Sequence, residues 1–475
     1  MKINLEKTLY ILFTLGLFFF SFNQTEVMPF MGEYVRESGA IFLFIGFMIM
    51  MIEIIIKGKV NFPIKNKLFH FLIVFYLITF FSVIVNISTV SENYFKKTTG
   101  ISRFIRQMIS LSIPILVFLP FFWRVIKDWT TKEIFIKIRT IFLYTLLFAG
   151  FYGAFEILFS YFHFYPAKYV LEFIGLIFPF IDPYYHSEGR ISGFAYEPPF
   201  FAIYLITVSG WMFSYILTEK NVIRKITPTL IIIVLTFFSG SRTGLLVIFF
   251  LLGIFILYLY KRNLYRNVIH NGVILLSLSS VLIFTLNSDK LIYSINEKFE
   301  SLNFVDNLKN NVSNKTRFGM QAASIEVFKE NPVFGVGFGQ QTYHARHHYP
   351  RWATVNNWEF EELYKNKLES SFPPGYNIFT RLLAETGIIG IISWITLLVY
   401  SIYILLKYYK NTNDEYTKFL CISIFISLIG LYINWLQTDT FRMYGVWIYF
   451  AILMKLDTTK FNLKNDTEYT NNTTL

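Results

Sequence analysis

The amino-acid sequence predicts an all-α polytopic membrane protein with about twelve transmembrane helices and a large helical loop on its outer face. The first observation is composition: the 475-residue chain is 54% hydrophobic and only 16% charged, whereas a soluble protein has about 25% charged residues. The second is a mean hydropathy of +0.47. The third is that the apolar residues form runs long enough to cross a bilayer. These features exclude a soluble globular enzyme and a disordered chain.

The membrane spans are predicted from the apolar runs, because about 20 mostly apolar residues cross the hydrocarbon core as a helix. Their approximate limits are 8–23, 39–56, 68–87, 107–123, 136–161, 199–217, 225–239, 242–260, 268–286, 387–408, 417–436 and 440–455. The first run follows Lys2 and Lys7, but no small-residue cleavage site comes after it. We therefore expect an uncleaved span and not a signal peptide.

The orientation is predicted from the Lys and Arg residues of short loops, which stay on the cytoplasmic side. Basic residues cluster in 57–67, 124–132, 220–225 and 261–266, and these segments alternate with acidic or mixed loops. Both termini are therefore expected in the cytoplasm. The segments expected on the outer face are 24–38, 88–106, 162–198, 240–242, 287–386 and 437–439. The basic residues of 88–106 argue against this orientation.

The domain organisation follows from the predicted spans. Residues 1–286 form a bundle of about nine helices that includes the outer segment 162–198. Residues 287–386 form a large outer loop and 387–455 three C-terminal spans. The polar residues 456–475 are expected to be a disordered cytoplasmic tail.

Charge and cysteine content exclude other classes of protein. The formal net charge of +12 comes from the cytoplasmic loops of this topology, so it indicates orientation and not a nucleic-acid partner. Cys421 is the one cysteine, which excludes an intrachain disulfide and a multi-cysteine metal site.

The outer loop 287–386 is the first place to look for chemistry, because structureless loops longer than about 15 residues are uncommon unless they are functional. Residues 317–329 carry apolar side chains at helical spacing, and the helix is expected to end at Asn331, before Pro332. A glycine-spaced turn follows over 333–339. A surface helix with a flexible turn explains the same pattern without a function.

Two arginines lie where spans begin. Ser239, Gly240 and Ser241 predict a tight hairpin turn before Arg242, which either snorkels to the interface or binds a phosphate as a bidentate fork. Arg190 and Glu197 directly precede the predicted span 199–217. They form either an interfacial ion pair or a site in which Glu197 orients an arginine or accepts a proton.

A histidine-rich segment, 343–352, lies later in the outer loop. His344 and His348 would share a helix face, but no carboxylate is nearby, so we expect no metal site and assign His344 a hydrogen bond to substrate. The aromatic residues around it suit either stacking on sugars or an interfacial belt. They include Trp358, Tyr364 and Phe372.

Together these segments resemble the superfamily of O-antigen polymerases and O-antigen ligases. Four motifs between residues 190 and 390 carry the resemblance, while the residues before 190 match only as generic membrane helices. The motifs are R-x-x-G-x-x-x-E-P from Arg190 to Pro198, S-G-S-R ending at Arg242, Arg317 followed by P-x-x-G-x-G-x-G from Pro332 to Gly339, and Tyr376-Asn377 followed by Glu385-x-Gly387.

The resemblance implies a membrane glycosyltransferase of the C type, which works without a metal or cofactor at the outer face of the bacterial inner membrane. It implies transfer of a growing glycan from undecaprenyl pyrophosphate onto the next lipid-linked repeat unit, as in surface polysaccharide biosynthesis. Arg242 and Arg317, with Arg190 as a weaker third, would bind the pyrophosphate. A polysaccharide chain-length regulator is a further candidate partner.

The remaining motif residues have less definite roles under the resemblance. Glu197 and Tyr376 are candidates to position or deprotonate the acceptor, Asn377 to contact the glycan and Glu385 to support its helix. The ligase branch has a histidine, held to be its base, where this chain has Tyr376. Because tyrosine titrates near pH 10, this difference favours a Wzy-type polymerase and leaves the base unassigned.

Two alternatives stay open. An O-antigen ligase differs in its acceptor. A lipid-linked glycan flippase or transporter would line a cavity at the membrane midplane with ionisable groups and often shows repeated halves. The predicted spans here carry few such groups beyond Glu53 and Glu156.

Overall fold

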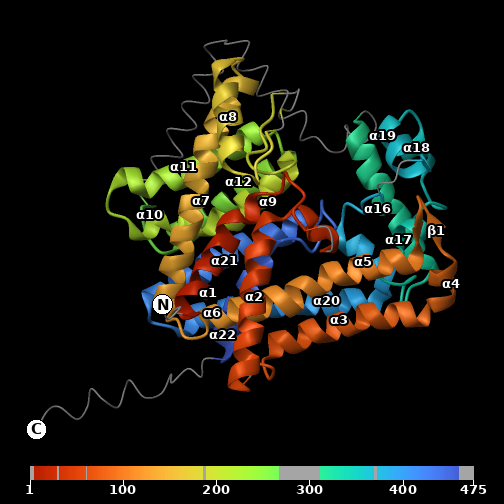
Figure 1. Ribbon diagram of the computed structural model, residues 1–475, viewed down its shortest axis with the longest axis horizontal. Helices are drawn as coiled ribbons and strands as arrows, with labels where there is room; N and C mark the ends of the chain where they lie inside the picture. The colour runs from red at the N-terminus through yellow and green to blue at the C-terminus, as the bar shows by residue number, and fades with distance from the viewer. Residues whose placement is uncertain are drawn as a thin grey trace, which may run out of the picture.

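The structure is a computed structural model that describes residues 5–28, 31–59, 61–183, 185, 189–266, 311–368 and 372–458. In these ranges the chain is helical except for loops and one short antiparallel hairpin, β1 (Tyr94–Phe95) and β2 (Thr98–Thr99). The protein is an all-α polytopic membrane protein, as the sequence predicted (Figure 1).

Nine helices of the described part are long and apolar enough to cross a membrane. They are α2 (Ser38–Lys57), α3 (Lys67–Val85), α5 to α6 (Gly100–Ile126), α7 (Thr131–Ser160), α9 to α10 (Pro198–Thr218), α11 (Val222–Ser239), α12 (Arg242–Lys261), α20 (Ile378–Asn411) and α21 (Glu415–Asn434). The first and last predicted spans form the shorter helices α1 (Leu5–Phe18) and α22 (Tyr444–Thr458). The predicted span 268–286 and the tail after Thr458 lie outside the described residues.

The remaining helices lie between the spans, and all of them except α16 are short. They are η1 (Phe19–Ser21), η2 (Gly32–Arg36), α4 (Ile87–Glu92), α8 (Pro166–Ile177), α16 (Val312–Glu330), α17 (Gln341–Ala345), α18 (Arg351–Thr354), α19 (Trp358–Phe360) and η4 (Glu361–Lys365). Figure 1 shows α16 to α19 gathered with α4 and β1 at one end of α3, α5 and α20.

The core of the bundle is built around α9, α21 and α22. Nearly every side chain of α9 and α22 is buried, and α9 packs against α7, α11, α12 and α21. Lipid accepts a helix that is apolar on all sides as readily as a protein interior does, and α2, which is at least as apolar as α9, is mostly unburied. The contacts with neighbouring helices, and not hydrophobicity alone, therefore place α9 and α22 inside the bundle.

Contacts between loops sort the chain into two faces. One, the site face, holds the described parts of 24–38, 88–107, 189–198, 311–377 and 437–442. Hydrogen bonds join these segments: Gln24 Nε2 to the Gly193 carbonyl at 3.2 Å, Gln107 Nε2 to Glu33 Oε1 at 2.6 Å and the Tyr343 hydroxyl to the Thr98 carbonyl at 3.0 Å. These segments belong to five of the six that the sequence places on the outer face, and the sixth, 240–242, lines a cavity together with residues of 189–198 and 311–377.

The opposite face, which we call the basic face, holds the loops near 57–67, 124–131 and 261–266. Arg124 pairs with Glu6 at 2.5 Å and with Glu53 at 2.9 Å. Asn66 Nδ2 donates to Asp457 Oδ2 at 3.1 Å. The start of α1 and the end of α22 therefore lie on this same face.

The basic segment 88–106 lies on the site face because its cations have partners there. Lys96 Nζ donates to the Leu363 carbonyl at 2.7 Å, and the Arg103 guanidinium lies 4.3 Å from the centre of the Phe372 ring. These charges serve contacts with the loop 311–377, which explains why the segment departs from the charge pattern of its neighbours.

A break in α20 anchors that loop to the membrane bundle. Gly387 has φ 63° and ψ −162°, which interrupts the helix and frees backbone groups on either side. The glycine-spaced turn satisfies them: the Val336 amide donates to the Ala384 carbonyl at 2.9 Å, the Gly337 amide to the Glu385 carbonyl at 3.0 Å and the Ile388 amide to the Pro332 carbonyl at 2.8 Å. This turn fixes the C-terminal end of α16 against α20.

Candidate active site

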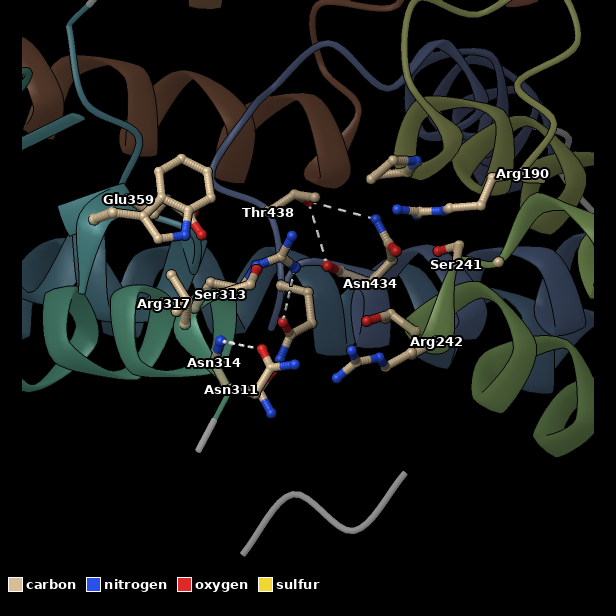
Figure 2. A pocket seen from close by; sticks show the side chains of 16 residues that line it. Arg190, Ser241, Arg242, Asn311, Ser313, Asn314, Arg317, Glu359, Asn434 and Thr438 are labelled. Atoms are coloured by element: carbon tan, nitrogen blue, oxygen red, sulfur yellow. Dashed lines mark hydrogen bonds between the residues drawn. The ribbon is translucent and has the colours of Figure 1, made fainter. Parts of the chain in front are cut away.

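A polar cavity of about 560 Å³ opens on the site face. Five separate stretches of the chain line it, and they bring Arg190, Arg242 and Arg317 together (Figure 2). The full lining is Arg190, Pro199, Gly240, Ser241, Arg242, Thr243, Asn311, Val312, Ser313, Asn314, Arg317, Trp358, Glu359, Asn434, Gln437 and Thr438.

Arg242 owes its position to the hairpin turn between α11 and α12. Gly240 caps α11 with φ 65°, a left-handed conformation that glycine adopts without steric cost. Ser241 caps α12, where its Oγ accepts a hydrogen bond from the Gly244 amide at 3.2 Å. Arg242 is the first residue of α12, so the tight turn predicted from the sequence is confirmed.

Arg190 reaches the same turn from a different loop. Its Nε donates to the Ser239 carbonyl at 3.3 Å. The Ile191 amide also donates to the Phe238 carbonyl, at 3.1 Å. The loop before α9 is thereby attached to the end of α11, which keeps Arg190 beside Arg242 although about 50 residues separate them in sequence.

Arg317 comes from α16, the helix predicted over 317–329. The helix spans Val312–Glu330 and ends at Asn331, as expected from the following proline. Nη1 of Arg317 donates to Gln437 Oε1 at 3.5 Å, and its guanidinium lies 5.1 Å from the centre of the Tyr376 ring. The buried Nε has no hydrogen-bond partner among the described residues.

Two helix N-termini also face the cavity. The lining includes Arg242 and Thr243 at the start of α12, and Val312, Ser313 and Asn314 at the start of α16. The first amides of a helix have no partner within it, and the helix dipole makes this end positive. With three arginines and a single carboxylate in the lining, the cavity is suited to a polyvalent anion.

Glu359 supplies that carboxylate, and the sequence did not single it out. It lies in α19, a three-residue helix that has no periodic pattern to draw attention to it. The Tyr376 hydroxyl donates to Glu359 Oε1 at 3.3 Å. Burial raises the pKa of the Glu359 carboxyl above its usual value, against the opposing effects of Arg317 and the Tyr376 hydrogen bond.

Tyr376 adjoins the cavity as a hydrogen-bond donor. Burial, followed by the charge of Glu359, raises the pKa of the Tyr376 hydroxyl well above 10. The hydroxyl therefore stays protonated at neutral pH. Of the two roles predicted for Tyr376, this environment favours positioning over deprotonation.

Glu197, the other predicted catalytic residue, does not join the arginines in the cavity. It is the N-cap residue of α9, its side chain is exposed, and the residue two positions on, Pro199, lines the cavity in its place. The two prolines that follow it fix the start of α9.

His344 and Asn377 also lie outside the lining. His344 belongs to α17, and burial together with His347 and Arg346 lowers its pKa to about 4. The Asn377 side chain caps α20, where it accepts hydrogen bonds from the Phe379 amide at 2.9 Å and the Thr380 amide at 3.2 Å. The substrate contacts expected of both residues stay predictions.

No metal centre is found in the part of the chain that the structure describes, where no group of three or more His, Cys, Asp or Glu side chains could hold an ion. The predicted helix shared by His344 and His348 stops at Ala345. His348 Nε2 instead lies 3.2 Å from Glu330 Oε2.

A buried polar network holds in place the segment that carries the cavity residues Gln437 and Thr438. Arg381 Nε pairs with Glu385 at 3.2 Å, which agrees with the supporting role expected of Glu385. Arg381 also donates to the Asp439 carbonyl at 2.7 Å and to Gln107 Oε1 at 2.6 Å. These bonds tie α20 and α5 to the segment that carries the cavity residues Gln437 and Thr438.

The fold and the cavity define a multi-pass membrane protein with a cationic site on one face. Residues 228–395 of the chain match the family model Wzy_C, described as O-Antigen ligase. The matched range runs from α11 into α20 and includes Arg242, Arg317, Glu359 and Tyr376, while Arg190 and Glu197 precede it. No match is found among curated proteins.

The match supports placing the chain in the superfamily of O-antigen ligases and polymerases. Members of this family are glycosyltransferase-like enzymes of lipid-linked glycans. The match supports a glycan transferase of ligase or polymerase type, and it favours neither of the two.

Proposed function

We propose that this protein is a surface polysaccharide polymerase. It transfers a growing glycan from undecaprenyl pyrophosphate onto the next lipid-linked repeat unit at the outer face of the bacterial inner membrane. The observation that carries the proposal is the convergence of Arg190, Arg242 and Arg317 with two helix N-termini in one cavity. A pyrophosphate ester needs charge stabilisation as it leaves, and preorganised donors supply it.

In this reaction an acceptor hydroxyl attacks the anomeric carbon of the donor sugar, and the bond from that carbon to the pyrophosphate oxygen breaks. Arg242 and the α12 N-terminus lie together and would hold one phosphate. Arg317, across the cavity in Figure 2, would hold the other. Guanidinium forks bind phosphate oxygens in a fixed orientation, which aligns the leaving group.

The membrane orientation is part of the proposal. The basic face carries the Lys and Arg clusters of the short loops and the ends of α1 and α22, so by the positive-inside rule it faces the cytoplasm. The site face is then periplasmic or extracellular, where a lipid-linked repeat unit is extended. A chain-length regulator stays a predicted partner.

The nearest alternative is an O-antigen ligase, which would use the same donor with another acceptor. The matched family fits both assignments equally, whereas Tyr376, in the place of the ligase histidine, supports the polymerase. A flippase or transporter has less support, because the cavity with the converging arginines opens on the loops of the site face.

The test is the length of the surface glycan in a strain that lacks this gene. We expect single capped repeats without the gene, and long chains again after complementation with the wild type. Arg242→Ala and Arg317→Ala proteins should be made in normal amounts and still give only single repeats. Arg262→Ala, on the basic face where Arg262 pairs with Glu415 at 3.3 Å, is the control and should restore long chains.

Two outcomes would overturn the proposal. Normal long chains with both cavity variants would show that the arginines are not needed for extension. A deletion strain with no glycan on its surface would indicate a ligase or a flippase instead of a polymerase.

A further inference from the structure

We infer that Glu359 is the catalytic base of the transfer reaction and that Tyr376 is its positioning residue. The inference rests on the proposed function and assigns the base that the sequence leaves open. It starts from the position of Glu359, which provides the single carboxylate of the cavity lining.

The cavity has two sides. In Figure 2, Glu359 and Arg317 lie on one side and Arg190 and Arg242 on the other, with Asn434 and Thr438 between them. The side with Arg190, Arg242 and the start of α12 holds only cationic and neutral groups, so it suits the donor pyrophosphate, whose second phosphate would reach across to Arg317. The space beside Glu359, the one carboxylate of the lining, is left for the acceptor.

The acceptor side also offers a surface for a sugar. Trp358, the neighbour of Glu359, lines the same cavity and is 71% exposed. An exposed indole face can pack against the apolar face of a pyranose ring. A sugar held there would bring its hydroxyl groups next to the Glu359 carboxylate, within reach of a proton transfer.

The surroundings of Glu359 make its carboxylate a stronger base. Arg317 from α16, Tyr376 from the loop before α20 and Tyr364 from η4 are the charged or titratable groups that face it. Burial raises the pKa of Glu359, while Arg317 and the Tyr376 hydrogen bond hold it down. The net effect is a raised pKa, so the Glu359 carboxylate is more basic than an exposed glutamate.

Other candidates for the base are less suitable. Glu197 is exposed and outside the cavity. The raised pKa of Tyr376 keeps its hydroxyl protonated. His344 lies outside the lining, in α17.

The proposed step balances as follows. The acceptor oxygen forms a bond to the anomeric carbon as its proton moves to a Glu359 oxygen. The bond between the anomeric carbon and the pyrophosphate oxygen breaks, and its electron pair leaves with undecaprenyl pyrophosphate. Glu359 then releases the proton to water, which restores the carboxylate for the next transfer.

The test uses the full-length protein in lipid nanodiscs, with lipid-linked repeat units extracted from the deletion strain as substrate. We expect Glu359→Gln to lower the rate of chain extension by about 10² to 10⁴-fold, the usual contribution of a general base. Binding of undecaprenyl pyrophosphate alone should change less than about threefold, because the substitution leaves the arginines in place. Retained binding also shows that the variant is folded.

The matched control is Glu362→Gln. Glu362 follows Glu359 by one helical turn, is exposed and accepts a hydrogen bond from Asn366 at 3.2 Å. It lies outside the cavity lining, so its substitution should leave the extension rate unchanged.

Tyr376→Phe tests the positioning role through the pH dependence of the rate. The hydroxyl stabilises the ionised form of Glu359, so its removal raises the pKa of Glu359. The acid limb of the rate profile should then move to higher pH, and most of the rate should return at high pH. A purely structural role of Tyr376 would lower the rate equally at every pH.

The outcomes separate this inference from the proposed function. If the wild type extends the glycan and Glu359→Gln extends it within about tenfold of that rate, Glu359 is not the base and the polymerase assignment stands. If the wild type itself forms no longer chains from these substrates, the proposed function fails first, and with it this inference.

Discussion

Arg190 packs directly against Gly240. The Arg190 Nε donates to the Ser239 carbonyl at 3.3 Å, and a Cβ atom on Gly240 would lie only 2.8 Å from that Nε. The turn thus needs glycine twice, for its φ of +65° and for the space that the arginine occupies.

Gly240→Ala should therefore displace Arg190 and lower chain extension by roughly ten- to a hundredfold, because a small misplacement of a binding group costs that much. Gly58→Ala is the matched control. Gly58 has φ +63° and also follows a helix, but nothing lies within 4 Å of a Cβ atom there. Alanine at this position has similar backbone strain, and the Gly58→Ala variant should extend chains at nearly the wild-type rate. Equal losses in both variants would mean that backbone strain alone is responsible.

Arg317→Lys should lower chain extension by roughly ten- to a hundredfold, although the charge is kept. Lysine lacks the guanidinium fork and the flat contact with the Tyr376 ring, which lies 5.1 Å from the Arg317 guanidinium. Lys315→Arg, on the same helix and outside the cavity lining, should be neutral. Titration with undecaprenyl pyrophosphate measures the loss directly. Wild-type affinity in the lysine variant would show that a point charge suffices.

Arg381→Met should destabilise the protein by about 3 to 5 kcal/mol, because it leaves a buried carboxylate without its cation. The side chains of Arg381 and Glu385 are both only 3% exposed and pair at 3.2 Å. Adding Glu385→Met should recover part of the loss, since no charge of the pair then stays buried. Thermal unfolding in one detergent compares the three proteins. A double variant that unfolds at a lower temperature than Arg381→Met would contradict this explanation.

Gly387→Ala should detach the glycine-spaced turn from α20. A Cβ atom would lie 2.3 Å from the Val333 carbonyl oxygen, at a φ of +63°. We expect a loss of more than about 2 kcal/mol in stability. Gly253→Ala in α12 meets nothing within 4 Å and should stabilise its helix by about 0.5 to 1 kcal/mol. We expect a lower melting temperature for Gly387→Ala and a higher one for Gly253→Ala. Equal shifts in the two variants would refute this prediction.

His344 should make the protein less stable in acid. Its folded-state pKa is lowered to about 4, whereas an unfolded histidine titrates near 6.5. The unfolded chain therefore binds more protons between these values, so the stabilisation is present above about pH 6.5 and lost as pH falls toward 4. The drop in melting temperature between about pH 7.5 and 5 should be smaller in His344→Gln, and unchanged in His163→Asn at an exposed site.

Local rules explain how much of the fold could be predicted. A span is set by the transfer free energy of its own side chains, so the nine membrane-length helices of the described part coincide with predicted apolar runs. A proline acts on the residue before it, so the end of α16 at Asn331 was predictable. The turn at Gly240 was predictable for a similar reason, because glycine and the serines beside it favour a turn locally.

The departures from prediction have non-local causes. Helix α20 begins at Ile378, ahead of the predicted 387, because Asn377 caps it and the turn 332–339 satisfies the break at Gly387. Nothing in the sequence near Gly387 signals a partner about 50 residues upstream. Glu197, whose motif pointed to chemistry, is the exposed N-cap residue of α9 and lies outside the cavity lining.

The sequence by itself therefore determined the membrane class, the membrane-length helices of the described part and the choice of three arginines as candidates for an anion site, because each of these follows from residues within a few positions of one another. Only the tertiary structure decided that the arginines share one cavity and that Glu359, and not Glu197 or His344, stands beside them. The reason is physical: a cavity is the space left when distant segments pack, and its lining here runs from Arg190 to Thr438.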